Sequence, residues 1–239
     1  MNIKVFQKGF NYSQDGPGNR LVYHLRGCNM RCPWCANPEG LTAAGGDTDV
    51  DALIDEVLRS RMMFFGGGGV TFTGGEPTLQ FEALSHILRT LRSHGINTCI
   101  ETNASHPRLP ELFEYIDHLI MDYKQPVADR HQAFTGVKLE VVEENIRRAC
   151  AEHPDVLIHI PLVNGYNAAP DEMEGMASFL AGLAKKNVRV EPLWYHEYGK
   201  SKWEQLGMPY TVENGHLSDE QKRAFLDILH AHGLETVRT

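Results

Sequence analysis

Three cysteines lie within eight residues of the chain, Cys28, Cys32 and Cys35, at spacings of four and three. Thiolates are soft ligands for zinc, copper(I) or iron-sulfur clusters, and a short loop lets them surround one compact metal centre. A structural zinc site normally has four protein ligands, so three thiolates leave one position open. On a four-iron cluster, an iron without a protein ligand can bind a substrate or cofactor directly.

Two other interpretations of this cysteine loop stay open at this point. The thiols could form a Cys3His zinc site, with His24 or a distant histidine as the fourth ligand, in an interaction module without catalysis. They could also be plain buried thiols, although three of only five cysteines in one loop is an unusual clustering. The other two, Cys99 and Cys150, are isolated, and we expect them to be small core residues.

The composition is that of a globular protein from a reducing compartment. The chain has 239 residues, of which 42% are hydrophobic and 23% charged, enough for one large domain. Residues 1–9 are too polar for a signal peptide and no apolar run reaches membrane-spanning length, so we expect a cytoplasmic protein without a membrane partner. Cysteines stay reduced there, which favours metal binding or catalysis. The net charge of -8 argues against a nucleic-acid-binding protein.

Apolar segments of strand length alternate with helical patterns. The predicted strands are residues 21–25, 70–73, 98–101, 119–123, 156–162 and 188–193. Apolar residues at intervals of three and four predict helices at residues 49–62, 79–94, 111–115, 141–152, 171–186 and 218–232. This alternation predicts βαβ units and a parallel sheet. Six units are too few for a closed barrel, so we predict an α/β fold, a partial (β/α)6 barrel open on one side. It forms a single domain, residues 1–239, with residues 1–20 as an N-terminal extension.

Polar residues stand where the predicted strands end, and in such folds the carboxyl ends of strands carry the chemistry. In chain order these ends are Arg26-Gly27-Cys28, Thr73-Gly74-Gly75-Glu76-Pro77, Glu101-Thr102-Asn103, Asp122-Tyr123-Lys124, His159 to Gly165, and Trp194-Tyr195-His196. The glycine pair allows the backbone to approach a ligand closely. Asp122, Lys124 and Glu101 could equally form a solvated ion pair. Trp34 either covers the loop or packs beside a heteroaromatic ring such as adenine.

At these residues the sequence resembles the radical S-adenosylmethionine (SAM) superfamily and, within it, the glycyl radical enzyme activases. The superfamily resemblance rests on the C-x3-C-x2-C loop with Trp34 and on Gly74-Gly75-Glu76-Pro77. The activase resemblance rests on Asp15-Gly16-Pro17-Gly18, Arg26-Gly27-Cys28, Asn37-Pro38, Glu101-Thr102-Asn103, Asp122-Tyr123-Lys124 and residues 195–203. Many activases carry a ferredoxin-like insert with further cysteines. Residues 36–73 contain none, so the chain is similar to the single-cluster activases of pyruvate formate-lyase.

The resemblance implies a radical SAM oxidoreductase with one 4Fe-4S cluster on Cys28, Cys32 and Cys35, whose open iron binds SAM. An electron from flavodoxin or ferredoxin would cleave SAM to a 5′-deoxyadenosyl radical. This radical would take a hydrogen atom from a glycine of a partner glycyl radical enzyme. We expect an anaerobic enzyme, a monomer that binds no nucleic acid. The alternative within the superfamily is an enzyme that acts on a small molecule.

The same resemblance implies roles for further residues. Gly74, Gly75 and Glu76 would hold the methionine part of SAM. The rest of the cofactor site would be lined by Trp34, Asn37, Asn103, Asp122, Lys124, His159 and His196. Glu101 and Asp122 would hold a monovalent cation, Na+ or K+, beside the cofactor carboxylate.

The resemblance also places Asp15, Gly16, Pro17 and Gly18 near the glycine-bearing loop of the partner. Two positions depart from the pattern. His159 replaces an arginine, and Glu101 replaces an aspartate. Both departures concern the contacts of the cation and of the cofactor carboxylate.

Overall fold

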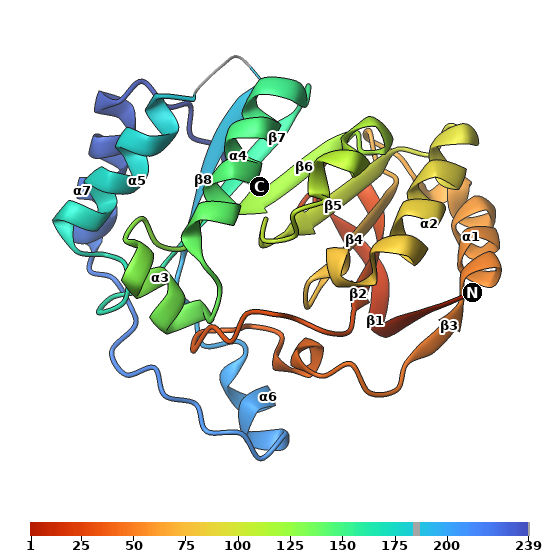
Figure 1. The fold of residues 1–239 in the computed structure, drawn as a ribbon, viewed down its shortest axis with the longest axis horizontal. Coiled ribbons are helices and arrows are strands. Elements are labelled where there is room, and N and C mark those ends of the chain that lie inside the picture. The colour runs from red at the N-terminus through yellow and green to blue at the C-terminus, as the bar shows by residue number, and fades with distance from the viewer. Residues whose placement is uncertain (184–186, 239) are drawn as a thin grey trace.

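The computed structural model describes residues 1–183 and 187–238 (Figure 1). The described residues form one sheet of eight strands, in the order β3-β1-β2-β4-β5-β6-β7-β8. Parallel pairing joins β2 (Asn19–Leu25), β4 (Val70–Gly74), β5 (Thr98–Thr102), β6 (His118–Asp122), β7 (Val156–Leu162) and β8 (Val188–Trp194). In the described chain the two outermost strands, β3 and β8, do not pair with each other. The prediction of an open partial barrel with six parallel strands is confirmed.

Two antiparallel strands extend this sheet and were not predicted. Residues 1–20, expected to be an extension, contribute β1 (Asn2–Tyr12), which pairs with β2. The short β3 (Asp47–Asp49) pairs with the start of β1. Ile3 is the one buried residue of β1, so this strand lacks the alternating apolar pattern by which a strand is recognised in sequence.

Helices cover the outer face of the sheet (Figure 1). Five predicted helices are confirmed: α1 (Val50–Arg59), α2 (Phe81–Ser93), α4 (Leu139–Glu152), α5 (Pro170–Ala181) and α7 (Asp219–Ala231). Residues 184–186 of the predicted fifth helix lie outside the described residues. The segment predicted as a helix at 111–115 is part of a 3-10 helix, η4 (Leu109–Tyr115). No helix among the described residues is long and apolar enough to cross a bilayer.

The remaining elements are short and lie mainly around the carboxyl ends of the strands. Neither α3 (Ala128–Thr135) nor α6 (Lys200–Gln205) was predicted, and the buried residues of α3 are the polar His131 and Thr135. The other 3-10 helices are η1 (Pro38–Leu41), η2 (Ser60–Met63) and η3 (Pro77–Gln80).

The C-terminal segment lies along the outer edge of β8. The Val190 N-H donates to the Glu235 carbonyl at 3.0 Å, and the Val237 N-H donates to the Val190 carbonyl at 3.0 Å. A short parallel bridge between Val190 and Thr236 results.

On β5, β6 and β7 the side chains that face the inside of the barrel change from apolar to charged along the strand. Cys99, Ile120 and Leu157 form a small buried cluster of their own, separate from the main core. Side chains two residues apart on a strand point to the same face, so Glu101, Asp122 and His159 follow this cluster on its inner face. Cys150 is buried in the main core, so both isolated cysteines are core residues, as predicted. The strand periodicity therefore places the charged residues at the carboxyl end of the barrel.

Close backbone contacts join the ends of β2 and β4. A side chain at Gly75 would bring its Cβ within 2.2 Å of the Gly27 carbonyl oxygen and 2.7 Å of the Gly40 oxygen. The Glu76 N-H donates to the Gly27 carbonyl at 2.7 Å. This contact fixes the start of the cysteine loop against the end of β4, and it requires glycine at position 75.

The first prediction concerns this contact. We expect Gly75→Ala to lower the free energy of unfolding by at least about 3 kcal/mol, because backbone atoms cannot move aside as a flexible side chain can. Gly9→Ala is the matched control, since a Cβ at Gly9 meets nothing within 4 Å. It should leave stability unchanged or raise it by up to about 1 kcal/mol. Urea unfolding of both variants measures the difference, and equal losses would contradict the contact.

Candidate active site

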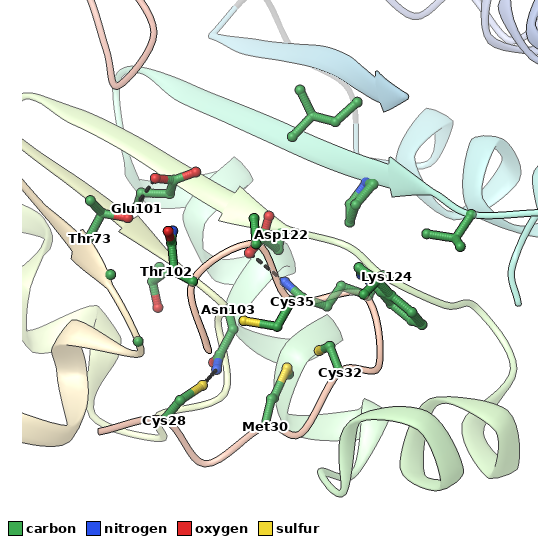
Figure 2. A pocket seen from close by; sticks show the side chains of 18 of the residues that line it. Cys28, Met30, Cys32, Cys35, Thr73, Glu101, Thr102, Asn103, Asp122 and Lys124 are labelled. Atoms are coloured by element: carbon green, nitrogen blue, oxygen red, sulfur yellow. Dashed lines mark hydrogen bonds and ion pairs between the residues drawn. The ribbon is translucent and has the colours of Figure 1, made fainter. Parts of the chain in front are cut away.

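A cavity lies at the carboxyl ends of the parallel strands, and Cys28, Cys32 and Cys35 line one side of it (Figure 2). We call it the cysteine cavity. The ends of β4, β5 and β6 line the opposite side with Thr73, Gly74, Gly75, Glu101, Thr102, Asn103, Asp122 and Lys124. Trp34, Asn37 and His196 also line it. The structure thus brings most of the predicted site residues together around one space.

Two helices hold the cysteine loop in place. The Arg31 N-H donates to the Thr135 carbonyl at the end of α3, at 2.9 Å. On the other side, the Trp203 indole N-H of α6 donates to the Cys35 carbonyl at 2.9 Å. The Trp34 ring packs edge-on against Phe134 and Tyr166, with centroids 6.3 and 5.3 Å away. Trp34 therefore both braces the loop and lines the cysteine cavity.

The three thiols have raised pKa values. Burial raises the pKa of Cys32 to about 12, and burial together with the Glu76 charge raises that of Cys28 to about 11. Burial also raises the pKa of Cys35. Raised pKa values favour the protonated thiols, so metal binding would displace their protons. Among the described residues, no three His, Cys, Asp or Glu side chains are arranged to hold a single metal ion. Three thiols that line one cavity are the donor set by which an iron-sulfur cluster would be held.

Glu76 is placed differently from the expectation that it holds a ligand. Its side chain is fully buried and is not among the residues that line the cysteine cavity. One carboxylate oxygen accepts hydrogen bonds from the Thr102 hydroxyl at 2.7 Å and from the Thr78 N-H at 3.0 Å. The other oxygen accepts a hydrogen bond from the Asn103 N-H at 2.7 Å. Burial raises the pKa of Glu76, and these hydrogen bonds oppose the rise. Its partners are groups of its own chain, so Glu76 positions the end of β5.

The Asn103 side chain connects the end of β5 to the cysteine loop. Its side-chain amide donates to the Asn29 side chain at 3.0 Å and lies 3.9 Å from the Cys28 sulfur. Its side-chain oxygen accepts the Ser105 hydroxyl at 2.6 Å. The end of β5 and the first cysteine are thereby connected through one amide.

Two acidic strand ends at the cavity are already paired with cationic side chains. Lys124 forms an ion pair with Asp122, and Figure 2 shows its ammonium group beside the carboxylate. Glu101 accepts the Thr73 hydroxyl at 2.6 Å and lies 3.4 Å from Nδ1 of His159. Although burial would raise the pKa of Glu101, the His159 charge and the hydrogen bonds lower it to about 2.

His159 lies behind Glu101 and is not among the residues that line the cavity. Its other ring nitrogen is 3.4 Å from a Glu191 carboxylate oxygen. Burial lowers the pKa of His159, but the Glu101 and Glu191 carboxylates outweigh it, and the pKa rises to about 10. His159 was expected to contact the cofactor directly. Instead its ring is held between two carboxylates of the chain.

The two residues expected to hold a monovalent cation both have partners within the chain. Glu101 is engaged by Thr73 and His159, and Asp122 by Lys124. A hard cation needs several oxygen ligands directed at one point. Here the two carboxylates are directed at two different partners of the chain.

The segment Asp15 to Gly18 lies at the opposite end of the barrel from the cysteine cavity. It connects β1 to the start of β2, and Gly16 and Pro17 line a second cavity together with His118, Asp155 and Arg189. The buried Arg20 donates to the Pro17 carbonyl at 3.1 Å. Burial and the Glu101 charge raise the pKa of Asp15 to about 6. The structure does not bring this segment to the cysteines.

The other predicted residues lie at the rim, together with several that sequence reasoning missed. His196 is exposed and stacks on Tyr198 with ring centroids 4.2 Å apart, and partial burial of the imidazole lowers its pKa. The Asn37 side-chain oxygen accepts a hydrogen bond from the Lys202 ammonium at 3.0 Å. Cavity residues without a predicted role are Met30, Ala36, Leu41, Thr73, Thr102, Pro161, Val163, Leu193, Trp194 and Tyr195. Seven of these ten residues lie in the last part of a strand or directly after one, and this position is the signal that could have identified them.

Comparisons with known proteins agree with this geometry. A sequence profile described as the Radical SAM superfamily matches residues 22–180. The pyruvate formate-lyase-activating enzyme of Staphylococcus epidermidis is 31% identical, over 87% of this chain and 86% of that protein. The crystal structure of a domain of pyruvate-formate lyase-activating enzyme from Bacteroides vulgatus superposes with a TM-score of 0.59 at 31% identity. It covers 72% of this chain and 98% of that one.

A radical SAM methyltransferase from Sphaerobacter thermophilus shares the fold. It superposes with a TM-score of 0.68 over 99% of this chain and 76% of that chain. The identity of 18% supports the fold alone.

The second prediction concerns Glu76. In Glu76→Gln one acceptor oxygen becomes an NH2 group that faces N-H or O-H donors, so we expect the free energy of unfolding to fall by about 2 kcal/mol. Glu82→Gln is the control, because the Glu82 side chain is 74% exposed and its ion pair with Arg108 is at the surface. Chemical unfolding tests both variants. If Glu76→Gln is as stable as Glu82→Gln, the buried carboxylate does not organise the strand ends.

Proposed function

The chain belongs to the radical SAM superfamily, and we propose that it activates a glycyl radical enzyme of the pyruvate formate-lyase type. The observation that best supports this function is the cysteine cavity, in which the three thiols of the loop face the polar ends of β4, β5 and β6. The 31% identity to a pyruvate formate-lyase-activating enzyme along most of both chains supports the same activity. The protein is a radical SAM oxidoreductase.

The family implies a 4Fe-4S cluster and SAM. In our proposal Cys28, Cys32 and Cys35 hold the cluster. When bound, the cluster and SAM supply one-electron cleavage of the sulfonium and a carbon radical able to remove hydrogen from a glycine Cα. The remaining work belongs to the chain, which must bind, orient and shield.

The cavity residues have distinct tasks in this proposal. Gly74 and Gly75 present backbone groups to the amino-acid part of the cofactor, and Asn103 is held in place for it by Glu76. Lys124 supplies a positive charge for a carboxylate, because its side chain lines the cavity and is 10% exposed. Trp34 offers an aromatic face, and His196 closes the rim. Apolar side chains such as Met30 and Leu193 exclude water, which a reactive radical requires.

The further parts of the proposal concern partners and setting. A single domain spans residues 1–239 and carries one cluster, since residues 36–73 contain no cysteine. The electron donor is flavodoxin or ferredoxin, and the enzyme is a cytoplasmic monomer that works without oxygen. The Asp15 to Gly18 segment contacts the glycine-bearing loop of the partner. Its distance from the cysteines along the barrel means that such a contact would involve a part of that loop away from the reacting glycine.

The alternative of a radical SAM enzyme that acts on a small molecule is not favoured. The pyruvate formate-lyase-activating enzymes of Staphylococcus epidermidis and Staphylococcus aureus match 87% of the chain at 31% and 30% identity. The methyltransferase shares the fold at only 18% identity. Colour separates this function from the zinc-bound interaction module. A zinc protein is colourless, whereas a cluster protein purified without oxygen is brown.

The third prediction tests the cluster ligands. In Cys28→Ala, Cys32→Ala and Cys35→Ala, we expect iron and sulfide per chain to fall below about a tenth of the wild-type content, with the fold retained. Cys150→Ala is the matched control, a buried cysteine of α4 outside the cavity that should keep the full metal content. Metal analysis and circular dichroism of anaerobically purified variants provide the measurements. Formation of 5′-deoxyadenosine at the wild-type rate by Cys32→Ala would refute the assignment.

The fourth prediction tests the activity. With SAM, a reductant and a pyruvate formate-lyase, we expect electron paramagnetic resonance to show a glycine-centred doublet. The same partner with its radical glycine changed to alanine is the control and should give none. SAM cleavage without a doublet for any candidate glycyl radical enzyme would favour the small-molecule alternative.

A further inference from the structure

A second cavity lies at the end of the barrel opposite the cysteine cavity, and no step of the proposed reaction takes place there. Its volume is about 360 Å³, a size typical of small-molecule sites. The amino ends of β6, β7 and β8 contribute His118, Asp155 and Arg189 to its lining, and the C-terminal segment contributes Arg238. The second cavity therefore brings together ionisable residues from three strands and from the tail.

One wall of the second cavity is apolar. Ile120 and Leu157 line it although they are only 2% and 6% exposed, so the cavity extends into the barrel. Val237 packs against the same small apolar cluster, and this contact holds the neighbouring Arg238 at the cavity. A ligand would thus meet hydrocarbon on one side and charged residues on the other.

The Asp155 carboxylate of the lining is already engaged within the protein. One of its oxygens accepts a hydrogen bond from Nδ1 of His118 at 2.5 Å, and the other forms an ion pair with the Arg189 guanidinium. Although burial would raise the pKa of Asp155, the His118 hydrogen bond and the Arg189 charge lower it. Nε2 of His118 contacts the Asn97 side-chain amide at 3.2 Å. Both Asp155 oxygens and both His118 ring nitrogens therefore have partners in the chain.

The two arginines, by contrast, keep N-H groups for a ligand. A guanidinium has five N-H donors in a planar fork, and Arg189 uses Nη2 for its bond to Asp155. Within the described part of the chain, Arg238 has neither a hydrogen-bond partner nor an ion-pair partner. Two arginines and one aspartate leave the lining with one excess positive charge even when His118 is neutral. The planar fork of an arginine matches a carboxylate, which accepts two parallel hydrogen bonds.

Neighbouring carboxylates do not cancel this excess charge. Three of them lie close in sequence to lining residues without lining the cavity themselves: Asp15, Asp117 and Glu235. Asp15 interacts electrostatically with the buried Arg20, and Asp117 forms an ion pair with Arg92. Glu235 is three positions from Arg238 along the extended tail, and side chains at an odd spacing on an extended chain point to opposite sides.

We propose that the second cavity binds a small organic carboxylate. Arg238 and Arg189 would donate hydrogen bonds to the carboxylate group, and a short apolar part of the ligand would contact Ile120 and Leu157. An inorganic anion would leave the apolar wall without a contact, and an uncharged apolar molecule would leave the Arg238 guanidinium without a partner. The inference goes beyond the proposed function and does not depend on it.

The first experiment uses butyrate as the probe, with n-butanol and inorganic phosphate as comparisons, all at constant ionic strength. Anaerobically purified wild-type protein is labelled with 15N-arginine, and its Nε-H signals are followed by nuclear magnetic resonance. We expect butyrate to shift the Arg189 and Arg238 signals saturably in the millimolar range. Binding of n-butanol or phosphate should be weaker by at least about tenfold, because each offers only one of the two kinds of contact. Absence of a saturable butyrate shift, or equally tight binding of either comparison molecule, would overturn the proposal.

The second experiment tests the position of the site with Arg238→Gln, which removes the charge but keeps a polar side chain. Followed through the Arg189 signal, the dissociation constant of butyrate should rise at least about tenfold. Arg223→Gln is the matched control, because Arg223 is an exposed arginine of α7 that does not line the cavity. Its dissociation constant should stay within about twofold of the wild-type value.

Equal butyrate binding by Arg238→Gln and the wild type would place the carboxylate elsewhere, such as beside Lys124 in the cysteine cavity, and would overturn the proposal. Arg238 is exposed, so we expect its variant to fold. The comparison of the three probes needs no variant and decides independently. Neither measurement requires SAM or a partner enzyme, so loss of the proposed activity and loss of carboxylate binding are observed separately.

Discussion

The buried carboxylate of Glu76 is the interaction on which the geometry of the site depends. It follows the end of β4, accepts hydrogen bonds from Thr102 and Asn103 at the end of β5, and so holds these two strand ends together. Asn103 continues the connection to Asn29 and Cys28 in the cysteine loop. Because a buried carboxylate tolerates few changes in its donors, this network fixes three separate chain segments relative to one another. The cavity wall is rigid where the proposed chemistry would take place.

The barrel interior is organised by depth. On β5, β6 and β7 the lower inward side chains are the apolar Cys99, Ile120 and Leu157, and the next inward positions on these strands are charged. Charged groups at this depth persist because each has a partner in the chain, as Asp122 has Lys124 and Glu101 has His159. The cavity therefore has an electrostatic environment that is largely set before any ligand binds. Such preorganisation lowers the cost of placing a charged cofactor beside low-dielectric walls.

Much of the fold could be predicted because buried parallel strands read as continuous apolar runs and their covering helices as three-four patterns. Strand β1 was missed since its side chains are mostly exposed, and α3 because its buried residues are His131 and Thr135. The convergence of the cysteines and strand ends was predictable from parallel topology alone. The directions in which Glu76 and His159 point were not, because a position at a strand end does not reveal which partners a side chain will find. The same limit applies to the segment Asp15 to Gly18, whose motif gave no indication of which end of the barrel it occupies.

The pairing of residues 235–237 with β8 has a practical consequence for handling the protein. An uncovered edge strand offers a row of free amide and carbonyl groups on which a second molecule can add its own strand, a common start of aggregation. The tail occupies those groups at Val190. Trimming it, or attaching a bulky fusion that pulls it away, would therefore be expected to shorten the shelf life of concentrated samples more than to alter the cavity at the far end of the strands.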